Sequence, residues 1–189
     1  MLSPAMEKLA SSLSCVTYRG DQHTHVLIEE SDKLAKLKKV TLKLHSGNWF
    51  AFAPDKGRGK AAQMSPLLAV GKEHEHHRAC DCVIFFIQNE QLRVVYLDLK
   101  SGNPVGYAGQ FKSTRQFTRY ALGLLEEFHG EKITLVEERY IVLWGGKATS
   151  MNKTPTVAQN DKTGASQPDR ALKREVMNGA SLWLKEFFG

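Results

Sequence analysis

Two β-rich runs separated by four polar residues constrain the fold of this chain more than any other feature. The runs "CVIFFI" (82–87) and "LRVVYLDL" (92–99) consist mainly of β-branched, aromatic and aliphatic residues, and "QNEQ" (88–91) lies between them. Such residues favour strands, and a short polar link between two strands is typical of a hairpin. We therefore expect an antiparallel pair of buried strands at the centre of the molecule.

The register of this hairpin brings charged side chains together. A turn centred on Asn89 and Glu90 pairs residues whose numbers add up to 179, so that Asp81 lies opposite Asp98. Directly opposed residues have Cβ atoms about 4.5–5.5 Å apart. Because side chains alternate between the two faces of a strand, Lys100 shares the face of Asp98. The sequence therefore predicts two carboxylates and an amine on one patch, and a slip of one residue would separate them.

Opposed carboxylates repel each other, so the patch needs a compensating charge. Mg²⁺ binds one or two carboxylates and completes its octahedron with water and substrate phosphate. A bound metal ion lowers the pKa of its water and stabilises charge at phosphorus, which is the chemistry of phosphodiester hydrolysis. The alternative is that Asp81 and Asp98 are solvated charges at strand ends and that Lys100 is their surface ion-pair partner.

The order of an acid, a hairpin and then Asp98-Leu99-Lys100 resembles the PD-(D/E)XK nuclease superfamily over roughly residues 40–128. The resemblance implies an α/β (α+β) fold with a restriction-endonuclease-like αβββαβ core, in which helices flank a mixed sheet. It also implies that Asp81, Asp98 and the Leu99 backbone carbonyl bind Mg²⁺, with Mn²⁺ as a substitute, and that Lys100 assists catalysis. The chain departs from the family pattern because no proline precedes Asp81 and because the second acid is Asp rather than the commoner Glu.

Many members of the superfamily carry a glutamine near the metal on the following helix. Gln110 and Gln116 are the two catalytic candidates, and an early helix position favours Gln110. Some members add a glutamate from the first helix, for which Glu29 and Glu30 are equal candidates. The helix itself is expected over residues 116–128, where an apolar stripe recurs at helical spacing. The stripe comprises Phe117, Tyr120, Ala121, Leu124, Leu125 and Phe128.

The stretch "EHEHHRACDC" (73–82) suggests an alternative, a zinc-stabilised interaction domain. A structural zinc site needs four ligands, usually two pairs from separate parts of the chain. All the candidates here lie within nine residues, namely His74, His76, His77, Cys80 and Cys82. We expect instead that both thiols point to the apolar side of the first strand, away from Asp81, where free cysteines behave as small hydrophobes.

Several basic side chains are candidate contacts for a nucleic-acid backbone. The net charge of +6 is compatible with phosphate binding. A plain surface loop is the competing interpretation for most of the candidates. They are Lys56, Arg58 and Lys60 in a glycine-broken loop, His77 and Arg78 before the first strand, and Lys112.

With 189 residues, the chain has the length of a single domain, 1–189, and the polar stretch 147–170 is expected to be a long loop. "HVLIEES" predicts either a strand or the start of a helix, and the last residues either two strands about Asn178-Gly179 or a terminal helix. No apolar run reaches about 18 residues, so no membrane span is expected. Three cysteines and no clear signal peptide favour a reducing cytoplasm.

These features together predict a Mg²⁺-dependent (endo)deoxyribonuclease that acts on DNA rather than RNA. The resemblance further implies a role in DNA processing or in antiviral defence against phage, and a homodimer or a larger protein partner. A non-catalytic nucleic-acid-binding or assembly subunit with the same fold is the alternative from a different functional class. Target sequence, strand preference and oligomeric state are left open.

Overall fold

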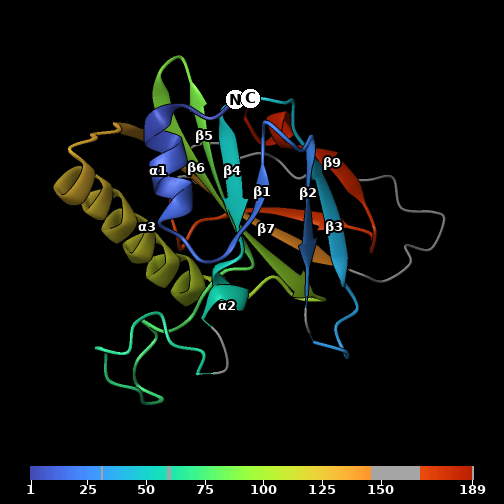
Figure 1. The fold of residues 1–189 in the computed structure, drawn as a ribbon. Coiled ribbons are helices and arrows are strands. Elements are labelled where there is room, and N and C mark those ends of the chain that lie inside the picture. The colour runs from blue at the N-terminus through green and yellow to red at the C-terminus, as the bar shows by residue number, and fades with distance from the viewer. Residues whose placement is uncertain (31, 59–60, 146–166, 189) are drawn as a thin grey trace.

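The computed structural model describes residues 1–30, 32–58, 61–145 and 167–188, and shows a mixed α/β fold with a large mixed sheet, a small sheet and few helices (Figure 1). The elements follow the chain in this order: α1 (Pro4–Ser11), β1 (Val16–Arg19), β2 (His25–Glu29), β3 (Lys39–Lys43), β4 (Trp49–Phe52), α2 (Pro54–Gly57), β5 (Cys82–Gln88), β6 (Gln91–Ser101), α3 (Tyr107–His129), β7 (Leu135–Gly145), β8 (Leu172–Val176), β9 (Ser181–Trp183) and the 3₁₀ helix η2 (Leu184–Phe187).

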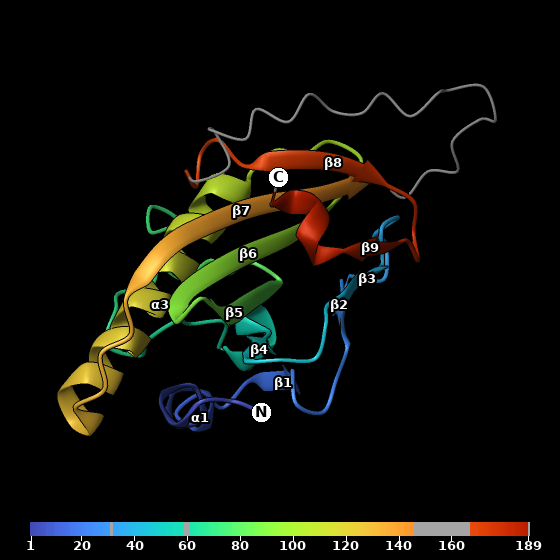
Figure 2. The same cartoon turned by 90° about the horizontal axis from the view of Figure 1, so that it is seen from above.

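The large sheet has the strand order β1-β4-β5-β6-β7-β8 (Figure 2). Its first four strands pair antiparallel, whereas β7 runs parallel to β6 and β8 runs parallel to β7. A parallel pair needs a crossover connection, and α3 is the crossover between β6 and β7. The small sheet has the order β2-β3-β9, with β9 parallel to β3.

The predicted hairpin register is confirmed. β5 and β6 pair from Cys82 opposite Leu97 to Gln88 opposite Gln91, so every pair of residue numbers adds up to 179. Asn89 and Glu90 both have positive φ, 52° and 63°, as a two-residue hairpin turn of type I′ requires. This local turn fixes the position of every later residue on both strands.

The large sheet separates two hydrophobic cores. Alternate residues of its central strands, such as Val83 and Tyr96, pack with α1 and α3, whereas Ile84 and Leu97 face the small sheet. Figure 1 shows α1 and α3 on one side of the large sheet and β2, β3 and β9 on the other. Because Asp98 has the same parity as Tyr96, it belongs to the face that α3 covers.

The first segment of the chain is a helix, and the last contains two short strands. Ser3 is the N-cap of α1 and Pro4 its first residue. The stretch at 25–29 is a strand, and β8 and β9 lie on either side of Asn178-Gly179, with η2 after them. These two strands belong to different sheets. Of the loop expected at 147–170, residues 147–166 lie outside the described residues.

Helix α3 begins at Tyr107, earlier than the apolar stripe predicts. Its buried side includes Thr114 and Thr118, which are fully buried, and the stripe prediction was wrong for Tyr120 and Phe128, which are 62% and 74% exposed. The helix turns a partly polar side toward the sheet, and a pattern of apolar residues alone does not detect such a side. No helix in the described ranges is long and apolar enough to cross a membrane.

Candidate active site

Asp81, Asp98 and Lys100 meet where β5 begins and β6 ends. Asp98 is fully buried, and its Oδ2 lies 2.7 Å from Lys100 Nζ. Asp81 precedes β5 by one residue, and its N–H donates to the Leu97 carbonyl at 3.1 Å. Its Oδ2 accepts a hydrogen bond of 2.6 Å from the Leu99 N–H. The hairpin register thus places Asp81 beside β6, and a backbone donor holds its carboxylate there.

Gln110 completes this group from the first turn of α3. Lys100 Nζ donates to Gln110 Oε1 at 2.7 Å, so the amine lies between the amide oxygen and the Asp98 carboxylate. Gln116 is exposed on the same helix, and no hydrogen bond within the described ranges joins it to the group. Of the two glutamine candidates, the structure places only Gln110 at the site.

The electrostatics of the group favour a cation. Burial raises the pKa of Asp98 to about 6, even though the neighbouring Lys100 ammonium lowers it. Burial, and after it the negative charge of Asp98, raises the pKa of Asp81 well above its ordinary value, against the lowering effect of the Leu99 N–H. Ionising both carboxylates therefore costs free energy. A positive charge that lies between them lowers this free-energy cost.

Two further acids contribute to this negative potential. Glu30, which follows β2, raises the pKa of both Asp81 and Asp98, and Asp55 in α2 raises that of Asp98. Glu30 comes from the end of a strand and not from a first helix, and its partner candidate Glu29 forms an ion pair with Lys56 at 3.5 Å.

Asp55 was missed by sequence reasoning. It follows β4, which runs antiparallel to β5 with Phe52 opposite Val83, so the end of β4 lies beside the beginning of β5. Knowledge that β4 pairs with β5 would have identified Asp55 as a neighbour of the site. The two strands are separated by about 30 residues, and no local sequence pattern sets their register.

The donor set suits a hard divalent cation. Neither carboxylate oxygen of Asp98 accepts a well-formed hydrogen bond from the described residues, although buried carboxylates are normally satisfied in this way. Nowhere in the described ranges do three His, Cys, Asp or Glu side chains converge as a ready metal site. Mg²⁺ needs fewer protein ligands than that, since one or two carboxylates with water and phosphate suffice. Asp81 and Asp98 supply two carboxylates of this kind.

The histidine-rich stretch organises a loop. His77 Nδ1 accepts a hydrogen bond from the Met64 N–H at 3.2 Å, and its Nε2 lies 3.0 Å from the Ala69 carbonyl oxygen. His76 Nε2 lies 2.8 Å from the same oxygen. Because one ring nitrogen of His77 accepts, the other must carry the proton and donate, so the ring is a neutral bridge across the loop.

The two thiols do not share a face. Cys82 packs with Ile84 on the side of the small sheet, as expected, but Cys80 packs under α3, where its N–H donates to Thr114 Oγ1 at 3.1 Å. The expectation for Cys80 was wrong because β5 begins only at Cys82, and strand alternation does not extend back to residue 80. Since the thiols lie on opposite sides of the sheet, they cannot bind one zinc ion together.

The basic candidates divide into two groups. Arg58 bonds to the His77 carbonyl and to Asp55, with 16% of its side chain exposed, so Arg58 and His77 hold the loop together. Lys56 and Arg78 are more than half exposed in weak ion pairs, and Lys112 is exposed. Lys60 lies outside the described residues. The side chains accessible to a phosphate backbone are therefore Lys56, Arg78 and Lys112.

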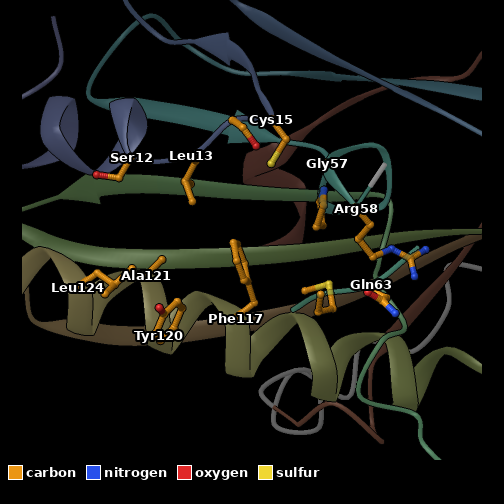
Figure 3. Close-up of a pocket in the computed structure, with 13 residues that line it drawn as sticks. Ser12, Leu13, Cys15, Gly57, Arg58, Gln63, Phe117, Tyr120, Ala121 and Leu124 are labelled. Atoms are coloured by element: carbon orange, nitrogen blue, oxygen red, sulfur yellow. The ribbon is translucent and has the colours of Figure 1, made fainter. Parts of the chain in front are cut away.

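A separate cavity of about 310 Å³ lies between the α1–β1 link, α2 and α3. Figure 3 shows Phe117 extending from α3 toward Leu13, with Tyr120, Ala121 and Leu124 farther along the helix. The cavity is lined by Ser12, Leu13, Ser14, Cys15, Pro54, Gly57, Arg58, Gln63, Met64, Phe117, Tyr120, Ala121 and Leu124. Asp81, Asp98, Lys100 and Gln110 do not line this cavity. Burial raises the pKa of the Cys15 thiol, which does line it. The cavity is distinct from the candidate active site.

No family model matches the chain, and neither a curated protein nor a solved structure matches it.

Proposed function

We propose that the protein is a Mg²⁺-dependent nuclease of the restriction-endonuclease-like class, which hydrolyses phosphodiester bonds in DNA rather than RNA. The observation that carries the proposal is the convergence of Asp81, Asp98 and Lys100 at one end of the β5–β6 hairpin, where the buried Asp98 carboxylate has the Lys100 ammonium as its ion-pair partner. A buried acid pair of this kind is costly to keep, and a cation bound between the two acids would offset the cost.

The order of elements supports the proposal. With β1 to β3 as an addition after the first helix, the sequence α1, β4, β5, β6, α3 and β7 has the αβββαβ order that the family resemblance implies. In this order β4, β5 and β6 form an antiparallel meander, and α3 leads into a parallel β7. The acids then lie at the strand ends next to the crossover helix, where the family resemblance expects them.

Each residue has a defined part in the proposed site. Asp81, Asp98 and the Leu99 carbonyl hold the ion, which supplies an activated water and stabilises negative charge on the phosphoryl group. The Leu99 N–H fixes the orientation of the Asp81 carboxylate. Gln110 holds the Lys100 amine in the site, where it can neutralise charge on the scissile phosphate or orient the attacking water.

Cleavage of supercoiled plasmid and of labelled oligonucleotides with added Mg²⁺ or Mn²⁺ tests the proposal. We expect Asp98→Asn and Lys100→Ala to lower the rate at least about 100-fold, because each removes a charge that acts on the transition state. Lys132→Ala is the matched control, since Lys132 is an exposed lysine in a surface ion pair with Glu126. Cleavage that survives both site substitutions would disprove the mechanism. Binding of nucleic acid without metal-dependent cleavage would favour the non-catalytic alternative.

A further inference from the structure

The small sheet has one buried and one exposed face. Val26, Ile28, Val40, Leu42 and Leu182 point inward and pack against the large sheet. The outward residues that alternate with them are exposed or half-buried. In Figure 2 the small sheet forms one side of the molecule, opposite α3. Its outward face is therefore a surface that the described residues do not cover.

One row of this face combines an imidazole, an amine and an indole. His25 of β2 pairs with Lys43 of β3, and Lys43 pairs with Trp183 of β9, so the three side chains lie side by side across the sheet. Trp183 is 36% exposed, whereas Trp49 is buried. An exposed indole flanked by cations is unusual on a surface that only has to be soluble, and aromatic side chains of this kind are enriched at binding sites.

The surroundings of Trp183 resemble a stacking site. Lys185 Nζ lies 5.3 Å and Lys43 Nζ 5.9 Å from the indole centroid, and the centroid of the His45 ring lies 5.1 Å from it, with the two rings tilted by 30°. Beside the indole is a hollow of about 380 Å³. The hollow is lined by Thr24, His25, Leu27, Thr41, Lys43, Leu44 and Trp183.

These contacts favour an unpaired nucleobase as the occupant. An exposed cation–π contact is weak, and stacking of a base on an indole is stronger, so a base can displace a lysine from the ring. The displaced ammonium is then free to bind the adjacent phosphate. A base inside a duplex has both faces covered by its neighbours, so only a single strand offers a free face.

The charge of the face points to the same ligand. Lys39, Lys43 and Lys185 are its cations, and the carboxylate of Glu29 on this face is paired with Lys56. The balance of charge is therefore positive around the aromatic row, which suits a phosphate backbone and disfavours a basic partner surface.

The same face extends along β2 toward α2. From His25 to Glu29 the strand extends about 13 Å at about 3.3 Å per residue. At the far end of this strand, Glu29 pairs with Lys56 of α2. A single strand held at Trp183 can therefore follow β2 toward α2.

We propose that the outward face of the β2–β3–β9 sheet binds single-stranded nucleic acid, with a base stacked on Trp183 and the neighbouring phosphates on Lys43 and Lys185. The part of this proposal that concerns the substrate rests on the nuclease function above. It restricts the substrate of the nuclease to nucleic acid that has an unpaired segment. Binding itself requires no metal and no cleavage.

Fluorescence anisotropy of a fluorescein-labelled single-stranded oligonucleotide in EDTA tests the binding site. We expect Trp183→Ala to weaken binding by roughly tenfold, Trp183→Phe to weaken it less because a ring remains, and Lys43→Ala with Lys185→Ala to weaken it and reduce its salt dependence. Lys132→Ala is the control and should bind as the wild type does. An unlabelled duplex of the same sequence should compete poorly.

The outcomes separate this proposal from the nuclease function. Wild-type affinity in both Trp183→Ala and the double lysine variant would overturn the stacking site, and equal competition by the duplex would overturn the preference for single strands. Asp98→Asn should bind the oligonucleotide normally while losing cleavage. A loss of binding in Trp183→Ala alongside wild-type protein that cleaves nothing would leave the stacking site intact and refute the nuclease.

Discussion

At the scale of single residues, Asp98 is the most consequential side chain of the molecule. It is fully buried, its partner is the Lys100 ammonium, and burial raises its pKa to about 6. Since the unfolded chain has an ordinary Asp pKa near 3.8, the native state binds more protons between these two values. The contribution of Asp98 to stability is therefore present at low pH and is lost as the pH rises through about 6.

Asp98→Asn is expected to stabilise the metal-free protein while abolishing cleavage. At pH 8 the substitution removes a buried charge and should raise the free energy of unfolding by about 1–3 kcal/mol. The upper limit of this range corresponds to the rise in the pKa of Asp98 from 3.8 to about 6. Urea unfolding in EDTA measures this difference, which should shrink toward zero at pH 4–5, where the native Asp98 is itself protonated. A variant that is less stable than wild type at pH 8 would contradict the assignment.

Proton competition should govern metal binding at the same residue. The carboxylate form binds Mg²⁺, so the raised pKa of Asp98 and Asp81 makes protons compete at a higher pH than at ordinary aspartates. We expect the Mg²⁺ concentration for half-maximal cleavage to rise steeply as the pH falls below about 6. A half-maximal concentration that stays constant between pH 7 and pH 5 would contradict this account.

Gln110 and Gln116 form a matched pair for testing the positioning of Lys100. Gln110→Ala removes the acceptor that holds the amine, so the cleavage rate should fall by about tenfold with little change in KM. Gln116→Ala changes an exposed position on the same helix and should leave the rate unaltered. Gln110→Glu, which keeps an acceptor oxygen, should retain more activity than the alanine variant. Equal effects of the two alanine substitutions would argue against a positioning role.

At the scale of elements, the hairpin could be predicted because all the information lies within about twenty residues. The β-rich runs, the two-residue turn and the strand alternation together define the register from Cys82 to Leu97, beside which Asp81 and Asp98 follow directly. The orientation of α3 could not be predicted in the same way, since its buried side is partly threonine. The position of Asp55 depended on a pairing of β4 with β5 across a long loop.

Alanine substitutions of Leu125 and Phe128 test the orientation of α3. Leu125 is 2% exposed and Phe128 is 74% exposed, although the apolar pattern treats them alike. Leu125→Ala should lower the free energy of unfolding by about 2–4 kcal/mol through lost burial and a cavity. Phe128→Ala should change it by less than about 0.5 kcal/mol. Denaturant unfolding monitored by circular dichroism measures both values, and similar losses would mean that the helix is rotated.

At the scale of the whole molecule, helices cover one side of the six-stranded sheet and the three-stranded sheet lies on the other (Figure 2). Sequence reasoning correctly expected a mixed sheet with helices beside it, but it did not anticipate the second sheet. That sheet joins β3 to β9, whose residues are about 140 positions apart. Local periodicity identifies each strand and cannot say which distant strand it pairs with.

Metal binding should stabilise the entire fold through mass action, since the ligands come together only in the native state. The melting temperature of the wild type should rise with Mg²⁺ concentration at pH 8, and the rise should be absent in Asp98→Asn. NaCl at equal ionic strength is the control for general salt effects. An identical shift in the wild type and in the variant would show that the ion binds elsewhere.

The late position of β9 has a consequence for synthesis of the protein. The β2–β3 pair leaves the ribosome early, yet its third strand arrives only when residues 181–183 have been translated. Until β9 has been made, Val26, Val40 and Leu42 are incompletely buried. The free edge of β3 also presents unpaired backbone amides to other chains. The β2–β3 edge of the nascent chain is thus exposed to aggregation, and a holding chaperone would bind the chain there.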